Sequence, residues 1–404
     1  MAELRHVGRI FVSLWGHRVG IIIPAPRQGF YAFKYDQSFL TSGIEIAPLM
    51  MPLRPEPYQF IELPLSEYYG LPPVFADSLP DAFGNTMIDR WMAQHGYEKN
   101  EVSPLDRLAY IGRRGIGALT YEPERGTGGR PTVLDMRQLV EEARRVVNGE
   151  LAGRDEPDAL REIIRIGSSA GGAQAKAVVG WNRATGSFML GDRELPDGFE
   201  HWIVKFTPQA YPWRGEREYD CYLKAKAAGL MVPEAVLYEL DNVRHFMVKR
   251  FDRAGCVRHH VQTLSAIAHF PMSVPLESRT YEQFMATVDE LNLGYDALEE
   301  AFRRTAFNIY VDECDDHTKN FSFLLKEGGR WSLAPAYDLT GSSFPSDDPW
   351  SAHGRRHQLS LNGKFADVTD DDLLAFADRF AIGTAPKILS QIKDVCGAHH
   401  RSRN

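Results

Sequence analysis

Apolar residues in the first part of the chain alternate with turn residues in a way that is typical of β-strands joined by hairpins. Residues 7–23 are rich in β-branched and aromatic side chains punctuated by glycine, which predicts a hairpin, and residues 29–36 predict a further strand. Beyond them the spacing changes, because Ile88, Trp91 and Met92 stand at positions i, i+3 and i+4. The pattern therefore predicts strands first and then a helix.

A second series of elements follows a break in this pattern. Residues 122–131 are rich in glycine and proline and contain no aliphatic residue, so they are the best linker candidate in the chain. Thr132 and Asp135 have the spacing of a capping box at the start of a helix. Downstream, strands are predicted at residues 175–181, 201–208, 235–240, 244–253, 321–325 and 331–339, with a hairpin turn at 182–187, and helices at 217–230, 280–311 and from about 369.

Composition narrows the class of protein. Of the 404 residues, 44% are hydrophobic and 25% are charged, which is average for a soluble globular chain of two or three domains. The net charge of -8 argues against nucleic-acid binding by bulk electrostatics. The four cysteines are scattered without a CxxC pair, and neither a signal-peptide pattern nor an apolar run of membrane-spanning length is found. A reducing cytoplasm is therefore the expected location.

The densest group of polar residues lies in "DECDDHTKNFSFLL", residues 312–325. Asp315 and Asn320 are five residues apart, the spacing with which the catalytic loop of protein kinases places a base and a metal ligand. A predicted hairpin follows and ends at Asp338, in position to be the second ligand of Mg²⁺. Aspartate and asparagine are also common in turns, so the spacing alone leaves a solvated turn open.

A second group of residues could hold phosphates. "GSSAGGAQAKAVV", residues 167–179, combines small residues that let a backbone approach a phosphate with Lys176 and a predicted strand behind them. It does not match a Walker A loop, and a flexible linker remains the alternative. Lys205 stands between apolar residues in the middle of another predicted strand, where a kinase lysine would hold phosphates, although an edge-strand lysine facing water is also possible.

Several stretches together resemble one protein family. They are "SSAGGAQAK", "IVKF", "VKRFDR", "FNIYVDECDDHTKNFSF", "LAPAYDL" and "HQLSLNGK", and toward the N-terminus "VSLWGHRVG", "FKYD" and "FADSLPDAFGN". This combination is similar to the HipA family of serine/threonine kinases, which are the toxins of bacterial toxin–antitoxin modules. The resemblance extends over about residues 7 to 380.

The resemblance implies a fold and a division of the chain. The fold is α+β and two-lobed, like that of protein kinases, with a β-rich N-terminal lobe, an added N-terminal subdomain and an all-α C-terminal lobe. The N-terminal subdomain is expected at residues 1–125, the nucleotide-binding part of the N-lobe at 132–255, and the helical C-lobe with the catalytic loop and metal site at 256–404. For the N-terminal subdomain, a scaffold and a docking surface for the antitoxin or the substrate both remain open.

Carried over position by position, the resemblance also implies roles for single residues. Asp315 resembles the catalytic base, and Asn320 and Asp338 resemble the ligands of Mg²⁺. His317 and Lys205 join Asp315 as catalytic residues, because they would lie against the phosphates of ATP. The implied ATP-binding residues are Ser169, Gly171, Gly172, Ala173, Gln174, Lys176, Lys205, Lys249, Arg250, Phe251, His317, Lys319, Asn320, Tyr337 and Asp338, of which Lys249 to Phe251 form the hinge.

The resemblance implies regulation and partners as well. Ser169 matches a serine that family members autophosphorylate, which ejects the nucleotide loop and switches the kinase off. The substrates studied in the family are aminoacyl-tRNA synthetases, whose phosphorylation arrests growth and gives persistence. The usual partner is a small helix-turn-helix antitoxin that represses the operon, so that DNA is contacted only through the antitoxin complex.

The sequence departs from the family pattern beside the catalytic loop. Where the family usually shows GNxDDH, Asp312 and Glu313 replace glycine and asparagine, and an extra carboxylate there is expected to raise carboxylate pKa values by repulsion or to alter substrate docking. Lys249 stands where an acidic hinge residue is common. Two other functions stay open: a kinase-like binding module that acts as corepressor, and a small-molecule phosphotransferase, which shares the loop spacing but lacks so long an N-terminal region.

Overall fold

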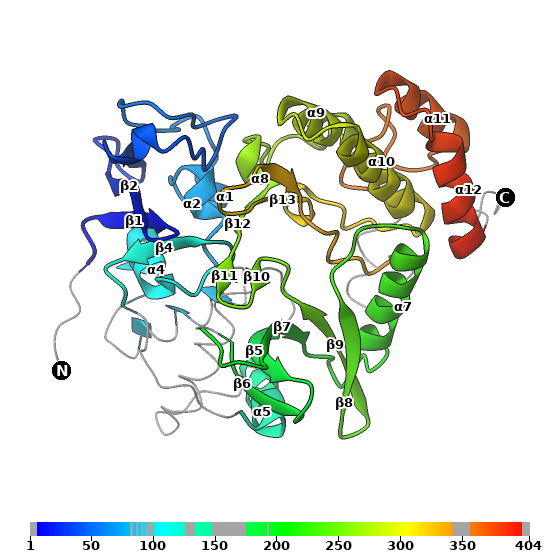
Figure 1. Cartoon of the computed structure of the whole chain (residues 1–404), viewed down its shortest axis with the longest axis horizontal. Coiled ribbons are helices and arrows are strands. Elements are labelled where there is room, and N and C mark those ends of the chain that lie inside the picture. The colour runs from blue at the N-terminus through cyan, green and yellow to red at the C-terminus, as the bar shows by residue number, and fades with distance from the viewer. Residues whose placement is uncertain are drawn as a thin grey trace.

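The computed structural model describes residues 6–80, 84–85, 88–89, 92–93, 98, 101–125, 134–147, 175–191, 194–341 and 356–397. Within these residues the strands form four antiparallel sheets, so the α+β class expected from the sequence is found. Figure 1 shows the N-terminal sheet on the left, a five-stranded sheet at the bottom and a group of helices at the upper right.

The N-terminal sheet has the strand order β3-β2-β1-β4, so its last strand arrives from far along the chain. The hairpin predicted at residues 7–23 is formed by β1 and β2, and the strand predicted at 29–36 is β3. Phe33 and Phe75 lie in a core that the sheet shares with short helices. The elements are β1 Ile10–Leu14, β2 His17–Pro24, β3 Tyr31–Tyr35, β4 Leu119–Glu122, η1 Phe39–Thr41, α1 Leu65–Tyr68, α2 Pro73–Ala76 and α4 Pro104–Ile111.

The five-stranded sheet has the order β6-β5-β7-β9-β8. On one of its faces Tyr222 of α7 packs against Ala235 and Phe246, and on the other Leu139 of α5 joins a core around Trp202. Two helices thus enclose the sheet (Figure 1). Its elements are β5 Lys176–Asn182, β6 Ser187–Leu190, β7 Glu200–Lys205, β8 Ala235–Leu240, β9 Val243–Lys249, α5 Met136–Val147 and α7 Arg214–Ala227.

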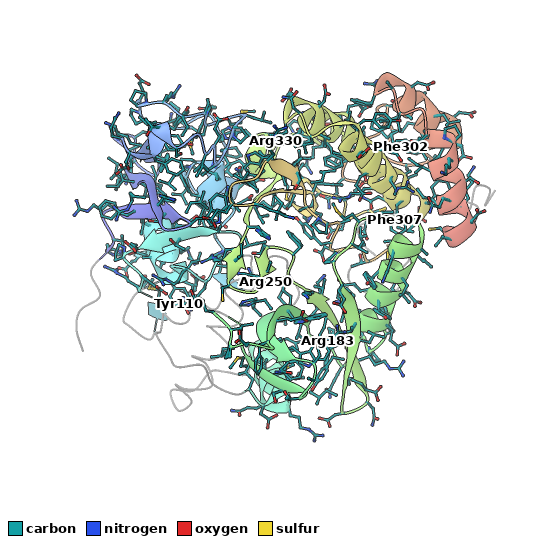
Figure 2. All side chains as sticks on the ribbon, viewed as in Figure 1. Tyr110, Arg183, Arg250, Phe302, Phe307 and Arg330 are labelled. Carbon is teal, nitrogen blue, oxygen red and sulfur yellow. The ribbon has the colours of Figure 1, made fainter. Side chains whose placement is uncertain are left out.

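The C-terminal part contains the largest core. Phe302 and Phe307 of α10, which are labelled in Figure 2, belong to it and are fully buried. The helices are α8 Leu264–Ile267, η3 Leu276–Ser278, α9 Tyr281–Glu290, α10 Tyr295–Tyr310, η4 Thr318–Asn320, α11 Asp370–Arg379 and α12 Ala385–Cys396, and the strands are β10 Arg253–Ala254, β11 Val257–Arg258, β12 His260–Thr263, β13 Ser322–Leu325 and β14 Trp331–Leu333.

Three details differ from the sequence-based prediction. An all-α C-terminal lobe is wrong, because β12, β13 and β14 form a sheet within residues 256–404. The helix predicted at 280–311 is two helices, α9 and α10, that separate where Gly294 adopts a φ of +86°. The turn at 182–187 leads into β6, which was not predicted, and not directly into the strand at 201–208. The capping box expected at Thr132 lies outside the described residues.

The N-terminal region is attached to the rest of the chain by polar contacts. The Asp77 carboxylate accepts hydrogen bonds from the backbone N–H of Thr263 at 2.7 Å and from its hydroxyl at 2.9 Å. Thr263 is the N-cap of α8, which packs against η4 in the loop of residues 312–320. The N-terminal region therefore supports the element that lies behind this loop.

Among the helices of the described residues, none has the length and apolar character needed to cross a bilayer.

Candidate active site

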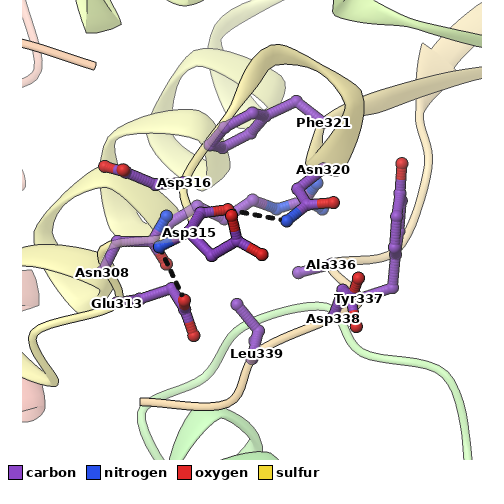
Figure 3. A pocket seen from close by; sticks show the side chains of 11 residues that line it. Asn308, Glu313, Asp315, Asp316, Asn320, Phe321, Ala336, Tyr337, Asp338 and Leu339 are labelled. Carbon is purple, nitrogen blue, oxygen red and sulfur yellow. Dashed lines mark hydrogen bonds between the residues drawn. The ribbon is translucent and has the colours of Figure 1, made fainter. Parts of the chain in front are cut away.

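The loop that follows α10 brings Asp315 and Asn320 to one side of a pocket (Figure 3). The Asn320 side chain donates a hydrogen bond from Nδ2 to the backbone oxygen of Asp315 at 2.8 Å. The spacing of five residues is thus explained by a loop that closes on itself through this bond, with η4 as its last turn. Asp338 lines the same pocket from the far end of the β13–β14 hairpin.

The Asp315 carboxylate is held in place without being buried. Its Oδ1 accepts a hydrogen bond from Gln358 Nε2 at 2.9 Å, and His317 Nε2 lies 3.7 Å from the same oxygen. With 43% of the side chain exposed, the carboxylate can still be reached by a substrate hydroxyl. Burial lowers the pKa of His317, which favours the neutral form of the ring. The role of Gln358 was not predicted, although "HQLSLNGK" was among the family-like stretches.

Asp316, the neighbour of Asp315, anchors the loop to the protein interior. Its carboxylate accepts hydrogen bonds from the Tyr281 hydroxyl at 2.6 Å, from His357 Nδ1 at 2.9 Å and from the backbone N–H of Gln358 at 2.6 Å. The side chain is completely buried. Asp316 therefore holds the loop in place, whereas the carboxylate of Asp315 faces the pocket.

The buried pair of His357 and Asp316 predicts a pH dependence of stability. Burial lowers the pKa of His357, but the Asp316 carboxylate raises it and the net shift is upward. A histidine whose pKa is raised by folding stabilises the protein most below its unfolded value of about 6.5, and this contribution is lost as the pH rises through the folded pKa. We expect His357→Asn to lower the free energy of unfolding by about 1–3 kcal/mol near pH 6 and by less at pH 8.5.

Urea unfolding of the wild type and of His357→Asn at both pH values measures this difference directly. Asp289, which is exposed near the other end of α9, provides a matched control as Asp289→Asn. A loss of stability that is the same at both pH values would contradict the assigned protonation of the pair.

Lys205 connects the five-stranded sheet to the helix α7 and to the pocket. Its Nζ contacts both Oε1 of Glu218 on α7 and Oδ1 of Asp338. The Lys205 and Glu218 side chains are each less than a tenth exposed, whereas 30% of Asp338 is exposed toward the pocket. Lys205 is therefore a buried lysine at the end of β7 with two carboxylate partners, which excludes the alternative of an edge-strand lysine facing water.

The charges in this triad are mutually stabilised. Burial lowers the pKa of Lys205, but Asp338 and Glu218 raise it and the net shift is upward. Burial raises the pKa of Asp338, but Lys205 and Lys176 lower it and the net shift is downward. Lys176, the first residue of β5, stands opposite Lys205 in the sheet and is buried as well. A second cation thus lies close to Asp338.

Glu218 is a site residue that was not predicted from the sequence. In protein kinases a strand lysine pairs with a glutamate of the following helix, and this pair is part of the active arrangement. The sequence contained a signal for this residue, because Glu218 lies in the helix that is predicted next after the Lys205 strand. The predicted helix at 217–230 contains this residue and α7 confirms the helix at Arg214–Ala227.

Tyr337 joins the catalytic loop to the segment expected to be the hinge. Its hydroxyl donates to the backbone oxygen of Lys319 at 2.6 Å and lies 2.6 Å from the Ser322 hydroxyl. The rings of Tyr337 and Phe251 lie 5.7 Å apart. Phe251 also packs against the apolar cluster around Val261. An apolar surface thus lies beside the loop that carries Asp315 and Asn320.

The other two residues of the expected hinge have their side chains engaged elsewhere. Lys249 Nζ contacts Glu200 Oε1. Arg250 is buried and donates from Nε and Nη2 to the Asp252 carboxylate at 2.9 Å and 2.7 Å; Figure 2 labels it near the centre of the molecule. A ligand at this segment would therefore meet backbone groups rather than these two side chains.

Glu313 lines the pocket, but its carboxylate is occupied by groups of the protein itself. The side chain is buried and accepts hydrogen bonds from the backbone N–H groups of Asp315, Thr340 and Gly341. Burial raises the pKa of Glu313 to about 7, and repulsion by Asp315 is the smallest of the causes. The expected rise of the pKa is found, with burial in place of like-charge repulsion as its main cause.

Part of the predicted site falls on residues for which no structure is given. Ser169, Gly171, Gly172, Ala173 and Gln174 lie outside the described residues. The site assembled above therefore consists of the catalytic loop, Asp338, the Lys205 triad and the strand carrying Lys176.

The donor set of this site fits Mg²⁺ together with a nucleotide. Magnesium prefers oxygen ligands and usually keeps one or two carboxylates plus phosphate oxygens. Asp338 and the Asn320 amide oxygen, which both line the pocket, can supply such ligands. Among the described residues no group of three His, Cys, Asp or Glu side chains forms a metal cluster of its own. Phosphate oxygens and water would supply the remaining ligands of a bound Mg²⁺.

Comparison with known proteins covers nearly the whole chain. A family model described as the HipA-like C-terminal domain matches residues 168–402, and one described as the HipA N-terminal domain matches residues 10–122. "Putative kinase Y4dM" of Sinorhizobium fredii (strain NBRC 101917 / NGR234) is 26% identical over 350 residues, which are 82% of this chain and 78% of that protein. A "Putative kinase" of Haemophilus influenzae (strain ATCC 51907 / DSM 11121 / KW20 / Rd) is 27% identical over 156 residues, 35% of this chain and 46% of that protein.

A solved structure shares the fold. A chain in the complex of the Shewanella oneidensis MR-1 toxin–antitoxin proteins HipA and HipB with operator DNA aligns with a TM-score of 0.66 and 16% identity. The alignment covers 95% of this chain and 88% of that chain. The order and packing of the elements are therefore those of an already known architecture.

Proposed function

The chain belongs to the HipA family, and on this premise we propose that it is an ATP-dependent protein serine/threonine kinase of the HipA toxin type. The observation that carries the proposal is the position of Lys205, which contacts Glu218 of α7 and Asp338 at the edge of a pocket that Asp315 and Asn320 also line. This is the set of groups that phosphoryl transfer requires of a kinase. Relatives named as putative kinases support it.

Each part of the site has a role in the proposed reaction. Asp315 orients the substrate hydroxyl and accepts its proton, and its partly exposed carboxylate supports this role. Lys205, with Lys176 beside it, holds the phosphates of ATP. Mg²⁺, held by Asp338 and Asn320, would neutralise negative charge on the phosphates. Lys319 and His317 lie next to the phosphates in the same loop.

The proposed lobes follow from these positions. The five-stranded sheet with α7 would be the N-terminal lobe, and α9 to α12 with the catalytic loop the C-terminal lobe. The four-stranded sheet would be the added N-terminal subdomain. The residues from Lys249 to Phe251 would be the hinge, and the apolar surface of Phe251 and Tyr337 is where we place the adenine.

The proposed target is a cytoplasmic protein such as an aminoacyl-tRNA synthetase, whose phosphorylation would arrest growth. A helix-turn-helix antitoxin is the proposed partner, and the related chain in a complex of HipA, HipB and operator DNA supports it. Contact with DNA would be indirect, which agrees with the net charge of -8. Phosphoproteomics of cells that express the chain would identify the target.

Incubation with labelled ATP and Mg²⁺ tests the proposal. We expect label on the chain itself, at Ser169, and on a protein of a bacterial lysate. Ser169→Ala should abolish the first signal and keep the second, because the Ser169 hydroxyl is proposed as an off-switch and not as a catalytic group. Phosphopeptide mapping and transfer to the lysate protein measure the two effects separately.

The outcomes separate the candidate functions. Nucleotide binding without any transfer would favour the kinase-like corepressor module over an enzyme. Transfer to a small molecule in place of a protein would favour a small-molecule phosphotransferase. If Ser169→Ala binds nucleotide normally but transfers nothing, the off-switch is wrong.

A further inference from the structure

We propose that Glu313 is a positioning residue, which ties the backbone of Asp315 to the segment that follows Asp338 and so sets the distance between the base and the metal ligand. The inference rests on the proposed kinase function, and it adds a residue that acts through these two. Glu313 stands three residues after the last residue of α10, and its backbone N–H donates to the Asn308 oxygen at 2.8 Å.

The tie consists of four hydrogen bonds to one buried carboxylate. Oε1 accepts the backbone N–H of Asp315 at 3.1 Å. Oε2 accepts the backbone N–H groups of Thr340 and Gly341 at 2.6 Å and 2.8 Å, and the Thr340 hydroxyl at 3.1 Å. Figure 3 shows Glu313 on the Asp315 side of the pocket, opposite Asp338. One side chain therefore connects the two halves of the site.

The segment that carries Asp338 needs such support. Asp338 has a φ of +58° and Gly341 a φ of +61°, so the backbone enters the left-handed region twice within four residues. For a residue other than glycine that conformation is strained and is held by its surroundings. Glu313 holds this segment after Asp338, through Thr340, and Tyr337 holds it before Asp338, through the Lys319 oxygen.

The chemical group at position 313 determines which of these four hydrogen bonds a substitution removes. All four partners of Glu313 are donors, so both carboxylate oxygens act as acceptors in these bonds. A glutamine can keep its oxygen toward Thr340 and Gly341, but its NH₂ group would then face the N–H of Asp315. Glu313→Gln therefore cuts the tie at the base alone, whereas Glu313→Ala cuts it at both ends.

The two variants are expected to fail in different ways. For Glu313→Gln we expect the transfer rate at saturating ATP to fall about 10–100-fold, because a misplacement of about 1 Å has such an effect, with an unchanged KM for ATP. For Glu313→Ala we expect in addition that the Mg²⁺ concentration for half-maximal nucleotide binding rises about 10–100-fold, the usual effect of losing a group that supports a metal ligand.

Rapid-quench kinetics and titration of nucleotide binding with Mg²⁺ measure the two effects, and thermal unfolding measures stability. Asp372→Asn is the matched control, because Asp372 on α11 accepts the N–H and hydroxyl of Thr369 at 2.7 Å each. This control should lower the unfolding temperature and leave the transfer rate unchanged. If Glu313→Gln behaves as the control does, Glu313 is only structural and the proposal is overturned.

Failure of the proposed function would look different. A wild-type chain that binds Mg²⁺ and nucleotide but transfers no phosphoryl group would refute the proposed kinase activity. In that case the Mg²⁺ dependence of nucleotide binding by Glu313→Ala would still test whether Glu313 holds the segment that follows Asp338. A wild-type chain that binds no nucleotide would overturn both. If Glu313→Ala does not fold, the transfer rate of Glu313→Gln decides.

Discussion

Asp315→Ala is expected to abolish phosphoryl transfer and to leave the fold intact. A general base contributes about 10²–10⁴-fold to a rate, so the loss should be at least of this size. The fold should survive because the loop is held by other groups, namely the buried Asp316 carboxylate and the bond from Asn320 to the backbone of residue 315. Single-turnover transfer from labelled ATP measures the rate, and thermal unfolding measures the fold.

The adjacent aspartate is the natural control for this experiment. Asp316→Asn removes a charge from the same loop, but its carboxylate faces Tyr281 and His357 in the interior. We expect it to lower the unfolding temperature more than Asp315→Ala does. Transfer that continues at the wild-type rate in folded Asp315→Ala would refute the assignment of the base.

Local patterns predicted those parts of the fold that depend on neighbours in sequence. Alternation with a turn predicted the hairpins β1–β2 and β8–β9, and helical spacing predicted α7. The strand β12 was missed because it is short and pairs with β13, about sixty residues further along the chain. Pairing over such a distance leaves no periodicity in the segment itself.

In the candidate site, too, contacts between neighbours in sequence were predicted and contacts between distant elements were not. Asp315 and Asn320 lie close together in sequence, and a single loop explains their spacing. The pairing of Lys205 with Glu218, and the contact of Gln358 with Asp315, join different elements and depend on how these pack. Glu313 was noticed only as a departure from the family pattern, because its partners at residues 340 and 341 come from the far end of a hairpin.

Asp338→Ala is expected to remove the response of nucleotide binding to Mg²⁺. The side chain is the one carboxylate assigned to the metal, and even the loss of a group that merely supports a ligand costs about 10–100-fold in metal affinity. The fold should persist, because Glu218 remains as a partner of Lys205 in the buried triad. Titration calorimetry with ADP, with and without Mg²⁺, measures the effect.

The affinity of Asp338→Ala for ADP, relative to the wild type, should differ between solutions without and with Mg²⁺. Without Mg²⁺, Asp338→Ala should bind ADP at least as tightly as the wild type, because Lys205 loses a competing carboxylate and the phosphates lose a repulsive neighbour. With Mg²⁺, only the wild type should gain affinity. Glu218→Gln is the matched control, since it removes the other partner of Lys205 and should leave the response to Mg²⁺ in place. An equal gain in Asp338→Ala and the wild type would exclude Asp338 as the metal ligand.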